Sequence, residues 1–504
     1  MDTKSQITVE KVPFAQKAAF GAGHLVNNLL PGALGVFSFF LITAFGIEPA
    51  IAGLLAAIPR FFDALSDPIM GFITDNTTSK WGRRRPYIFS GAILASILFI
   101  IQWQMFEENG STYNFWYFLL FSILFIFANT IFSTPLIGMG YEMTSDTKER
   151  TRLMGIANSV GQISWMIVPL FWVLIANKDL FETQADGVRT LSLFVGFACL
   201  IFGVLPAIFC KDIDISDAKS KANLTIKDLA VNLKILWLNM KNITKNNPFM
   251  RLCGATFLVF NGFQMVASFS YFIIVFYMFK GSYEMAGTVP AIFSILGAFF
   301  TAVLIIPIVS WMANRFGKRN AFIISTFISI IGYILKWWGF VEVDENTAVL
   351  FNDVVLQIGV VNFSLEMPII LLLPIPFIAF GLGGLFTLMM SMTADVCDLD
   401  ELRNGLPRRE GTFGAVYWWM VKIGQSIALA LGGFVLSIVG FDAGSATQSI
   451  ETMNQLRIAD IVIPSLTAGL AVLIMWNYNL NEERVSRIKI ELEERRAIKK
   501  QSNL

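Results

Sequence analysis

The chain has 504 residues, of which 55% are hydrophobic and only 15% are charged, and its formal net charge is +1. A soluble globular protein carries about 25% charged residues, so a chain this apolar needs lipid as part of its solvent. The balanced charge gives no sign of a nucleic-acid partner, and the four cysteines lack metal-ligand spacing.

Twelve stretches are long and apolar enough to span a bilayer as helices, since each span needs about 20 mostly apolar residues. The polar segment before the first stretch, Met1–Lys17, lacks a short apolar core with a small-residue cleavage site, so we expect no removable signal peptide. The sequence predicts an all-α membrane protein. In chain order the spans lie near 18–45, 49–74, 87–106, 114–142, 152–177, 190–210, 250–279, 286–312, 321–341, 367–394, 411–440 and 457–478.

The Lys and Arg residues predict the orientation of these spans. With both termini on one side, most of the 38 basic residues fall in the loops of that side, and the opposite loops hold only Lys178, Arg189, Lys280 and Arg457. The long loop 342–366 contains acidic residues and no basic one. By the positive-inside rule, both termini should be cytoplasmic, in a protein of the bacterial inner membrane.

The longest polar interruption, residues 211–248, divides the spans into two sets of six. This pattern predicts a major facilitator fold, in which two six-helix halves surround a central cavity. Within the interruption, residues 224–242 alternate apolar and basic residues and predict an amphipathic helix on the inner membrane surface. The predicted parts are an N-terminal half at 1–210, a cytoplasmic linker at 211–248, a C-terminal half at 249–480 and a charged cytoplasmic tail at 481–504.

The second span carries three charges inside the membrane, Arg60, Asp63 and Asp67. Spacings of three and four place them on one helix face, and each charge costs about 2.5–3.5 kcal/mol at the bilayer centre. Two carboxylates one turn apart, with Ser66 beside them, form a hard-oxygen site that suits Na⁺ or H⁺. The alternative is a static Arg60–Asp63 ion pair, which would leave Asp67 unpaired. Lys422 in the eleventh span should face the same watery cavity.

Polar and aromatic residues of other spans are candidates for lining that cavity. Amides and hydroxyls can donate to and accept from sugar hydroxyls, and aromatic rings suit the flat C–H faces of sugars. The alternative for each amide is an interhelical hydrogen bond, worth about 0.6 kcal/mol on average, and the only histidine, His24, fits packing as well as substrate contact. The candidates are Asn27, Asn28, Asn129, Ser133, Asn158, Gln162, Asn261, Gln264, Phe386, Trp418 and Gln425.

A short basic motif recurs after the second and the eighth span. Gly82 precedes Arg83 in the first copy, and Gly317 precedes Lys318 in the second. Acidic residues at the ends of the fourth and tenth spans, such as Glu142, could pair with these bases when the inner side closes, although the bases also suit simple membrane anchors. The candidate cytoplasmic gate comprises Asp75, Gly82, Arg83, Arg84, Arg150, Arg319, Asp395 and Asp398.

The motif in the second span resembles a family signature. It reads Arg60-x-x-Asp63-x-x-Ser66-Asp67-Pro68-Ile69-Met70-Gly71, followed by Trp81-Gly82-Arg83 and Pro86. This is similar to the glycoside–pentoside–hexuronide:cation symporters, as are Ala394–Asp398, Arg409-Glu410-Gly411 and the region of Lys422. The resemblance covers essentially all twelve spans. It implies the major facilitator fold and sugar uptake coupled to Na⁺, Li⁺ or H⁺.

The resemblance also implies roles for single residues. Asp63 and Asp67 would ligate the cation, Thr130 stands where the family has a nearby hydroxyl, and Ser66 replaces an asparagine. Lys422 matches a lysine close to both the cation and the sugar.

The sugar site departs from the family pattern. Asn28 and Ser133 stand where the best-known member binds a galactoside through carboxylates, and Asn158 stands where it has an arginine. With two negative charges missing, a uronic acid met by Lys422 or Arg60 is more plausible than a galactoside.

Together these features predict a secondary active transporter that moves a glycoside, pentoside or hexuronide with Na⁺ or H⁺ by alternating access. No cofactor beyond the transported cation and no obligatory protein partner is expected. One alternative is a symporter of lysophospholipids, because such a vertebrate symporter resembles the same family and 47 Phe residues suit an apolar cargo. Others are a proton-driven drug exporter and a transporter-like membrane sensor. An enzyme is not expected, because a single His and no activated nucleophile leave acid–base catalysis without candidates.

Overall fold

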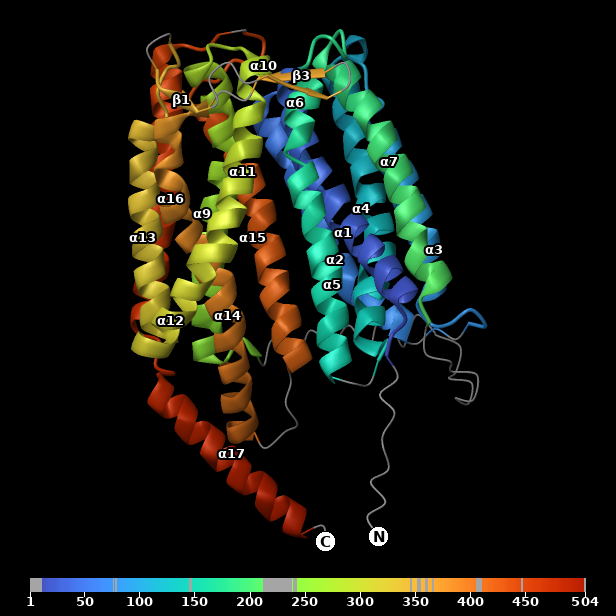
Figure 1. Ribbon diagram of the computed structural model, residues 1–504, viewed down its shortest axis with the longest axis vertical. Coiled ribbons are helices and arrows are strands. Elements are labelled where there is room, and N and C mark those ends of the chain that lie inside the picture. The colour runs from blue at the N-terminus through green and yellow to red at the C-terminus, as the bar shows by residue number, and fades with distance from the viewer. Residues whose placement is uncertain are drawn as a thin grey trace. The chain divides into compact units, whose positions relative to one another are not determined.

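The computed structural model describes residues 11–502 except 76, 78, 145–146, 212–237, 239–242, 345–346, 351–354, 359–360, 365–366, 405–409 and 446. Twelve helices among these residues are long and apolar enough to cross a membrane, as predicted. The chain forms two compact units (Figure 1): unit 1 is Met1–Ile47 with Ile58–Val231, and unit 2 is Glu48–Ala57 with Asn232–Leu504. The predicted amphipathic helix at 224–242 lies almost wholly outside the described residues.

The described residues of unit 1 form seven helices and one short 3-10 turn, η1 (Glu107–Asn109). Helix α3 packs against α4 and α7, and α1 packs against α5 and α7. Gly91 allows the close approach of α3 to α4, because a Cβ there would lie 2.5 Å from the backbone nitrogen of Phe132. The helices are α1 (Phe14–Thr43), α2 (Pro49–Asp75), α3 (Arg85–Gln102), α4 (Ser111–Glu142), α5 (Thr147–Ile167), α6 (Leu170–Ala176) and α7 (Gln184–Phe209).

The fifth predicted span, 152–177, is divided in the structure into α5 and α6. Pro169 lies at the division. It has no backbone N–H with which to continue the helical ladder, so the chain turns there before α6 begins.

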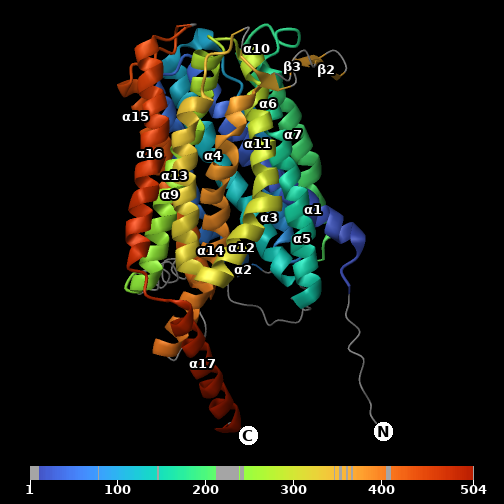
Figure 2. The same cartoon turned by 60° about the vertical axis from the view of Figure 1, so that its left-hand side comes forward.

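Where unit 2 is described, it contains nine helices in addition to the first turns of α2. They are α9 (Asn247–Phe272), α10 (Tyr283–Ala286), α11 (Thr288–Phe300), α12 (Ile306–Phe316), α13 (Lys318–Gly339), α14 (Pro374–Asn404), α15 (Glu410–Ile438), α16 (Ile450–Trp476) and α17 (Glu482–Ser502). Helix α9 lies against α14, α15 and α16, and α13 lies against α14 and α16. Figure 2 shows α9, α13 and α16 side by side.

Two π-helical segments interrupt spans that the sequence predicts as regular. The first, η2 (Ile273–Met278), extends α9, and the second, η3 (Thr301–Ile305), joins α11 to α12. Pro307 lies two residues after the end of η3 and cannot donate a backbone hydrogen bond, which favours a local change of helix pitch. A 3-10 turn, η4 (Ile369–Leu372), precedes α14.

The acidic loop after α13 contains strands that the sequence did not predict. Strand β1 (Val349–Leu350) pairs with β4 (Met367–Pro368), and β2 (Val355–Ile358) pairs with β3 (Val361–Ser364), both antiparallel. The strands contain several β-branched residues, which favour extended backbone.

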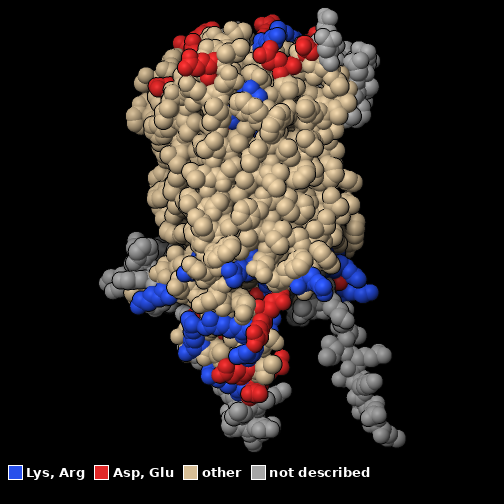
Figure 3. All heavy atoms as spheres, turned by 90° about the vertical axis from the view of Figure 1, so that its left-hand side faces the viewer, with Lys and Arg blue, Asp and Glu red and all other residues tan. Residues whose placement is uncertain are grey.

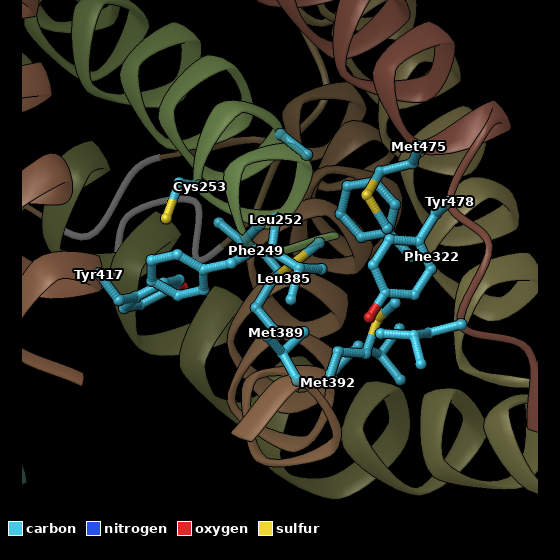
Figure 4. Packing of buried hydrophobic residues seen from close by; sticks show 14 of the residues in the cluster. Phe249, Leu252, Cys253, Phe322, Leu385, Met389, Met392, Tyr417, Met475 and Tyr478 are labelled. Carbon is cyan, nitrogen blue, oxygen red and sulfur yellow. The ribbon is translucent and has the colours of Figure 1, made fainter. Parts of the chain in front are cut away.

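The core of unit 2 extends from the spanning helices to the C-terminal tail. Figure 4 shows Phe249 and Leu252 of α9 near Leu385 and Met389 of α14. The same buried cluster includes three residues of α17, Val485, Ile488 and Leu492. Their spacing of three and four places them on one helix face, so the tail predicted only as charged is a helix packed against unit 2.

A buried ion pair joins three helices of unit 2. Lys336 of α13 and Asp460 of α16 form a salt bridge, and their side chains are only 3% and 0% exposed. Lys336 Nζ donates to Ser270 Oγ of α9 at 2.8 Å, and Ser270 Oγ donates to Asp460 Oδ1 at 3.1 Å.

Arg457 was expected in a loop but lies inside α16, where it donates to two carbonyl oxygens near the end of α13 at 2.8 and 3.1 Å.

We predict that Asp460→Ala strongly destabilises the protein, because it leaves the Lys336 ammonium buried without its counter-charge. Breaking a buried pair in this way costs on the order of 3–5 kcal/mol, whereas replacing both partners with apolar residues is often neutral. The double variant Lys336→Met with Asp460→Leu should therefore recover most of the lost thermal stability. Thermal unfolding of the purified variants in detergent measures this, and a double variant no more stable than Asp460→Ala would contradict it.

Candidate cation and substrate site

The carboxylates of α2 face hydroxyls of α4 inside unit 1. Asp63 is 5% exposed and Thr130 is 1% exposed. Thr130 Oγ1 donates to Asp63 Oδ1 at 3.4 Å, and the hydroxyls of Thr130 and Ser66 are 2.9 Å apart. Ser66 also donates to the Asp63 carbonyl oxygen at 3.2 Å. The structure thus brings together three of the four predicted cation residues.

A second contact repeats this arrangement one turn further along both helices. Thr134 Oγ1 of α4 donates to Asp67 Oδ1 of α2 at 3.1 Å. Thr130 and Thr134 are four residues apart, as are Asp63 and Asp67, so equivalent faces of the two helices meet twice. We call these five residues, Asp63, Ser66, Asp67, Thr130 and Thr134, the hydroxyl–carboxylate ladder.

Thr134 was not among the predicted site residues. The signal for it was its spacing of four from Thr130, but a hydroxyl within an apolar span is as common in packing as in a site. The static Arg60–Asp63 ion pair was disfavoured because it would leave Asp67 unpaired. The hydrogen bond from Thr134 gives Asp67 a neutral partner, so that objection no longer holds in full. Arg60 Nη1 lies 3.9 Å from Asp63 Oδ2, so the expected pair exists at a long distance beside the ladder.

The ladder offers two carboxylates and three hydroxyls, all hard oxygen ligands of the kind that small cations prefer. Hydrogen bonds donated to a carboxylate favour its anionic form. Hydroxyl donors retain lone pairs that can also ligate a cation. Within the described residues, no group of three or more His, Cys, Asp or Glu side chains could hold a metal, so a resident metal centre has no candidate there.

The predicted substrate residues of unit 1 differ in burial. Asn129 precedes Thr130 on α4 and is buried, and its Oδ1 has no hydrogen-bond partner among the described residues. Asn28 of α1 lies against Gly161 of α5, where a Cβ would come 2.5 Å from the Asn28 amide nitrogen. Asn27 and Ser133 are half-buried, whereas Asn158 and Gln162 are exposed on α5.

The predicted substrate residues of unit 2 include an aromatic platform. The rings of Phe386 on α14 and Trp418 on α15 are stacked, with centroids 6.4 Å apart and an interplanar angle of 18°. Phe260 of α9 meets Phe386 edge to face at 5.8 Å. Trp418 is 45% exposed, so the platform has an accessible face.

A buried amide lies on the same set of helices. Asn261 of α9 packs against Gly424 of α15, and neither of its amide atoms has a hydrogen-bond partner in the described part of the chain. Gln264 on α9 and Lys422 and Gln425 on α15 are half-buried. A buried unpaired amide costs about 1–3 kcal/mol, so a polar ligand that reached Asn261 would recover that energy.

The gate residues of unit 1 form a charged cluster between the start of α3 and the end of α4. Arg83 Nη2 and Arg84 Nη1 lie 2.5 and 2.7 Å from the two carboxylate oxygens of Glu142. Gly82 has φ +100°, a backbone conformation that favours glycine. The side chains of Asp75 and Arg150 lie outside the description.

A second acid fixes the start of α1 near this cluster. Lys17 Nζ lies 2.5 Å from Glu149 of α5, which also accepts a hydrogen bond from the Val12 backbone N–H at 3.2 Å. The hydrogen bond from the Lys17 ammonium holds the pKa of Glu149 below its ordinary value. The contact is therefore fully present at neutral pH and is lost only as the pH falls through that lowered pKa.

The gate residues of unit 2 include one acid–base pair of the expected kind, whereas Arg319 makes other contacts. Asp395 of α14 pairs with Lys318 at 2.5 Å and with Lys489 of α17 at 3.8 Å. Arg319 instead donates to the backbone carbonyls of Met475, at 3.3 Å, and Trp476 at the end of α16. Asp398 is buried one turn after Asp395.

Comparison with known proteins identifies the family of the chain. The family described as MFS/sugar transport protein matches residues 19–482. The chain is 24% identical over 484 residues to the isoprimeverose transporter of Lactiplantibacillus pentosus, covering 95% of this chain and 91% of that protein. It is 23% identical over 487 residues to the glucuronide carrier protein homolog of Escherichia coli, covering 96% of each. It is also 23% identical over 540 residues to the sodium-dependent lysophosphatidylcholine symporter 1-A of Danio rerio, covering 96% of this chain and 90% of that protein.

Among solved structures, the fold is similar to a bacterial homolog of the human lysosomal transporter Spinster. The TM-score is 0.63 with 14% sequence identity, over 92% of this chain and 95% of that one. The family match and the named relatives define a membrane transporter and not an enzyme. The chain belongs to the MFS/sugar transport protein family, and within it to the glycoside–pentoside–hexuronide:cation symporters. The predicted major facilitator fold and family are thus confirmed.

The ladder predicts a specific role for the Thr134 hydroxyl. Thr134→Val keeps the shape of the side chain but removes the donor to Asp67, and a hydrogen bond to a charged group is worth about 1.5–3 kcal/mol. We expect the cation concentration for half-maximal stimulation of uptake to rise on the order of tenfold. Thr134→Ser, which keeps the hydroxyl, should stay close to the unmodified protein. Equal cation dependence of the Val and Ser variants would exclude this role.

Proposed function

We propose that the protein is a symporter that moves a sugar together with Na⁺ or H⁺ by alternating access. The observation that carries this proposal is the hydroxyl–carboxylate ladder. In it, Asp63 and Asp67 lie inside a membrane span, and each accepts a hydrogen bond from a threonine hydroxyl of α4. Intramembrane acids at a pair of facing helices indicate an ion pathway by default. A cation there would neutralise the carboxylates, and its loss would leave them to repel each other.

The proposed orientation places both termini in the cytoplasm of a bacterium. On the face of unit 2 drawn in Figure 3, basic side chains gather at the end that carries α17, below an uncharged band. This distribution supports the positive-inside assignment. The acidic loop after α13 would then face the outside.

The substrate site proposed here combines amides with an aromatic platform. The half-exposed Trp418 ring suits the C–H face of a sugar, and Asn261 offers both a donor and an acceptor to its hydroxyls. Two relatives are named for isoprimeverose and for a glucuronide. Lys422 on α15, one turn from Trp418, would then meet an anionic substituent such as a uronate.

A direct test is uptake by purified protein in vesicles with an imposed cation gradient. Asp63→Asn removes the charge but little volume, so the site loses most of its attraction for a cation. We expect cation-stimulated uptake to fall by at least about tenfold while the variant still folds and inserts. Asp179→Asn, which changes an exposed acid of unit 1 outside the ladder, should retain stimulation. Undiminished stimulation in Asp63→Asn would refute the proposed cation site.

A lysophospholipid cargo is the main alternative, since one relative is named for lysophosphatidylcholine. The two cargoes make opposite demands, because an acyl chain needs continuous apolar lining whereas a sugar needs hydrogen-bond partners. We expect mono- and disaccharides, uronic acids included, to stabilise the protein in a thermal-shift screen and to compete for uptake. Competition by lysolipids alone would favour the alternative, and absence of any flux in vesicles would favour a sensor.

A further inference from the structure

A groove of about 590 Å³ lies on the surface of unit 2, between the beginning of α9 and the end of α16. None of its lining residues belongs to the ladder, the aromatic platform or the candidate gate. The groove therefore has no part in the proposed transport chemistry. Its composition nevertheless indicates a ligand.

The two ends of the groove differ in polarity. Asn247 and Arg251 lie in the first two turns of α9, and Asn477 directly follows α16. Leu258 lies on α9 about 16 Å beyond Asn247 and about 10 Å beyond Arg251, at the helical rise of 1.5 Å per residue. Leu470 and Leu473 of α16 line the same groove. One end is thus polar and the rest apolar, which matches a headgroup followed by an acyl chain.

Arg251 is held at the polar end of the groove. Its Nη1 donates to the Ile474 carbonyl oxygen at 3.1 Å. This contact uses one of five guanidinium N–H donors, and the planar fork of the others is suited to a phosphate. Lys245 is exposed two residues before α9 begins, and the helix N-terminus adds partial positive charge.

Gly254 lies on α9 between Arg251 and Leu258, which both line the groove. A Cβ at this position would come 3.5 Å from the Cδ1 of Ile474, another lining residue. A larger side chain would therefore extend toward the groove without a backbone clash. This glycine gives a way to fill the groove while Arg251 is kept.

We propose that the groove binds an anionic phospholipid, with its phosphate on Arg251 and an acyl chain along Leu258, Leu470 and Leu473. Charge complementarity selects an anionic headgroup, and basic pockets between spanning helices on the cytoplasmic side are suited to such lipids. The leaflet follows from the proposed orientation, in which α9 begins and α16 ends at the cytoplasmic surface. The proposal does not depend on the sugar or on the cation.

The test is native mass spectrometry of the full-length protein in detergent, titrated with phosphatidylglycerol or phosphatidylcholine of identical acyl chains. One basic residue near the headgroup is worth about 1 kcal/mol, so Arg251→Gln should weaken phosphatidylglycerol binding by about fivefold and abolish its advantage over phosphatidylcholine. Arg315→Gln removes an exposed basic residue at the end of α12, outside the groove, and should leave binding unchanged. Gly254→Leu should weaken binding of both lipids.

Other outcomes identify other occupants and overturn the proposal. Equal binding of the two lipids by the unmodified protein, or unchanged binding by Arg251→Gln, would remove the anionic headgroup from the site. Stabilisation by inorganic phosphate as strong as by phosphatidylglycerol in a thermal-shift assay would indicate an anion site without a lipid. Dimers that Gly254→Leu abolishes, with no lipid bound to either protein, would indicate an interface between copies of the chain.

Discussion

The structure depends on one constraint, that a charge inside a membrane span needs a partner within the protein. The two units meet it differently. In unit 2, Lys336 and Asp460 neutralise each other in a sealed environment with Ser270 as their third member. In unit 1, Asp63 and Asp67 each accept a hydrogen bond from a neutral hydroxyl, and Arg60 lies 3.9 Å from Asp63. A sealed ion pair has no need of an exchangeable ion, whereas carboxylates solvated by hydroxyls can take one up and release it. This difference separates a structural ion pair from a candidate coupling site.

The sequence predicted the spans and the family but only part of the site. Span length and hydropathy are local properties, so the twelve helices followed from composition, and the spacing of Asp63 and Asp67 followed from helix geometry. The contacts of Thr134 and Ser270 could not be predicted, because a hydroxyl in an apolar span gives no sign of its partner. The partners of these two hydroxyls lie 67 and 190 residues away in the chain. The π-helical segments and the helix α17 were also missed. For η3, the structural cause is a proline just beyond it, whose effect on helix pitch is not visible in hydropathy. For α17, the apolar residues that pack on unit 2 are few and lie within a highly charged tail.

The candidate residues are divided between the units in a way that bears on coupling. The ladder belongs to unit 1, while the stacked pair of Phe386 and Trp418, with Lys422 one turn away, belongs to unit 2. In the proposed function, coupling would require binding on one unit to change the affinity of the other. The phospholipid groove lies between α9 and α16 alone, so its occupancy would act on the stability of unit 2.

The contacts of α17 affect how the protein can be handled. Asp395 meets Lys489 of α17 as well as Lys318, and Arg495 donates to the Leu402 carbonyl oxygen at 2.9 Å. Cutting the chain before α17 would uncover apolar surface that Val485, Ile488 and Leu492 now cover. It would also take a positive charge away from Asp395. A purification tag or fluorescent reporter is therefore better attached beyond Ser502 than substituted for the tail, and a shortened protein would be a poor reference for transport rates.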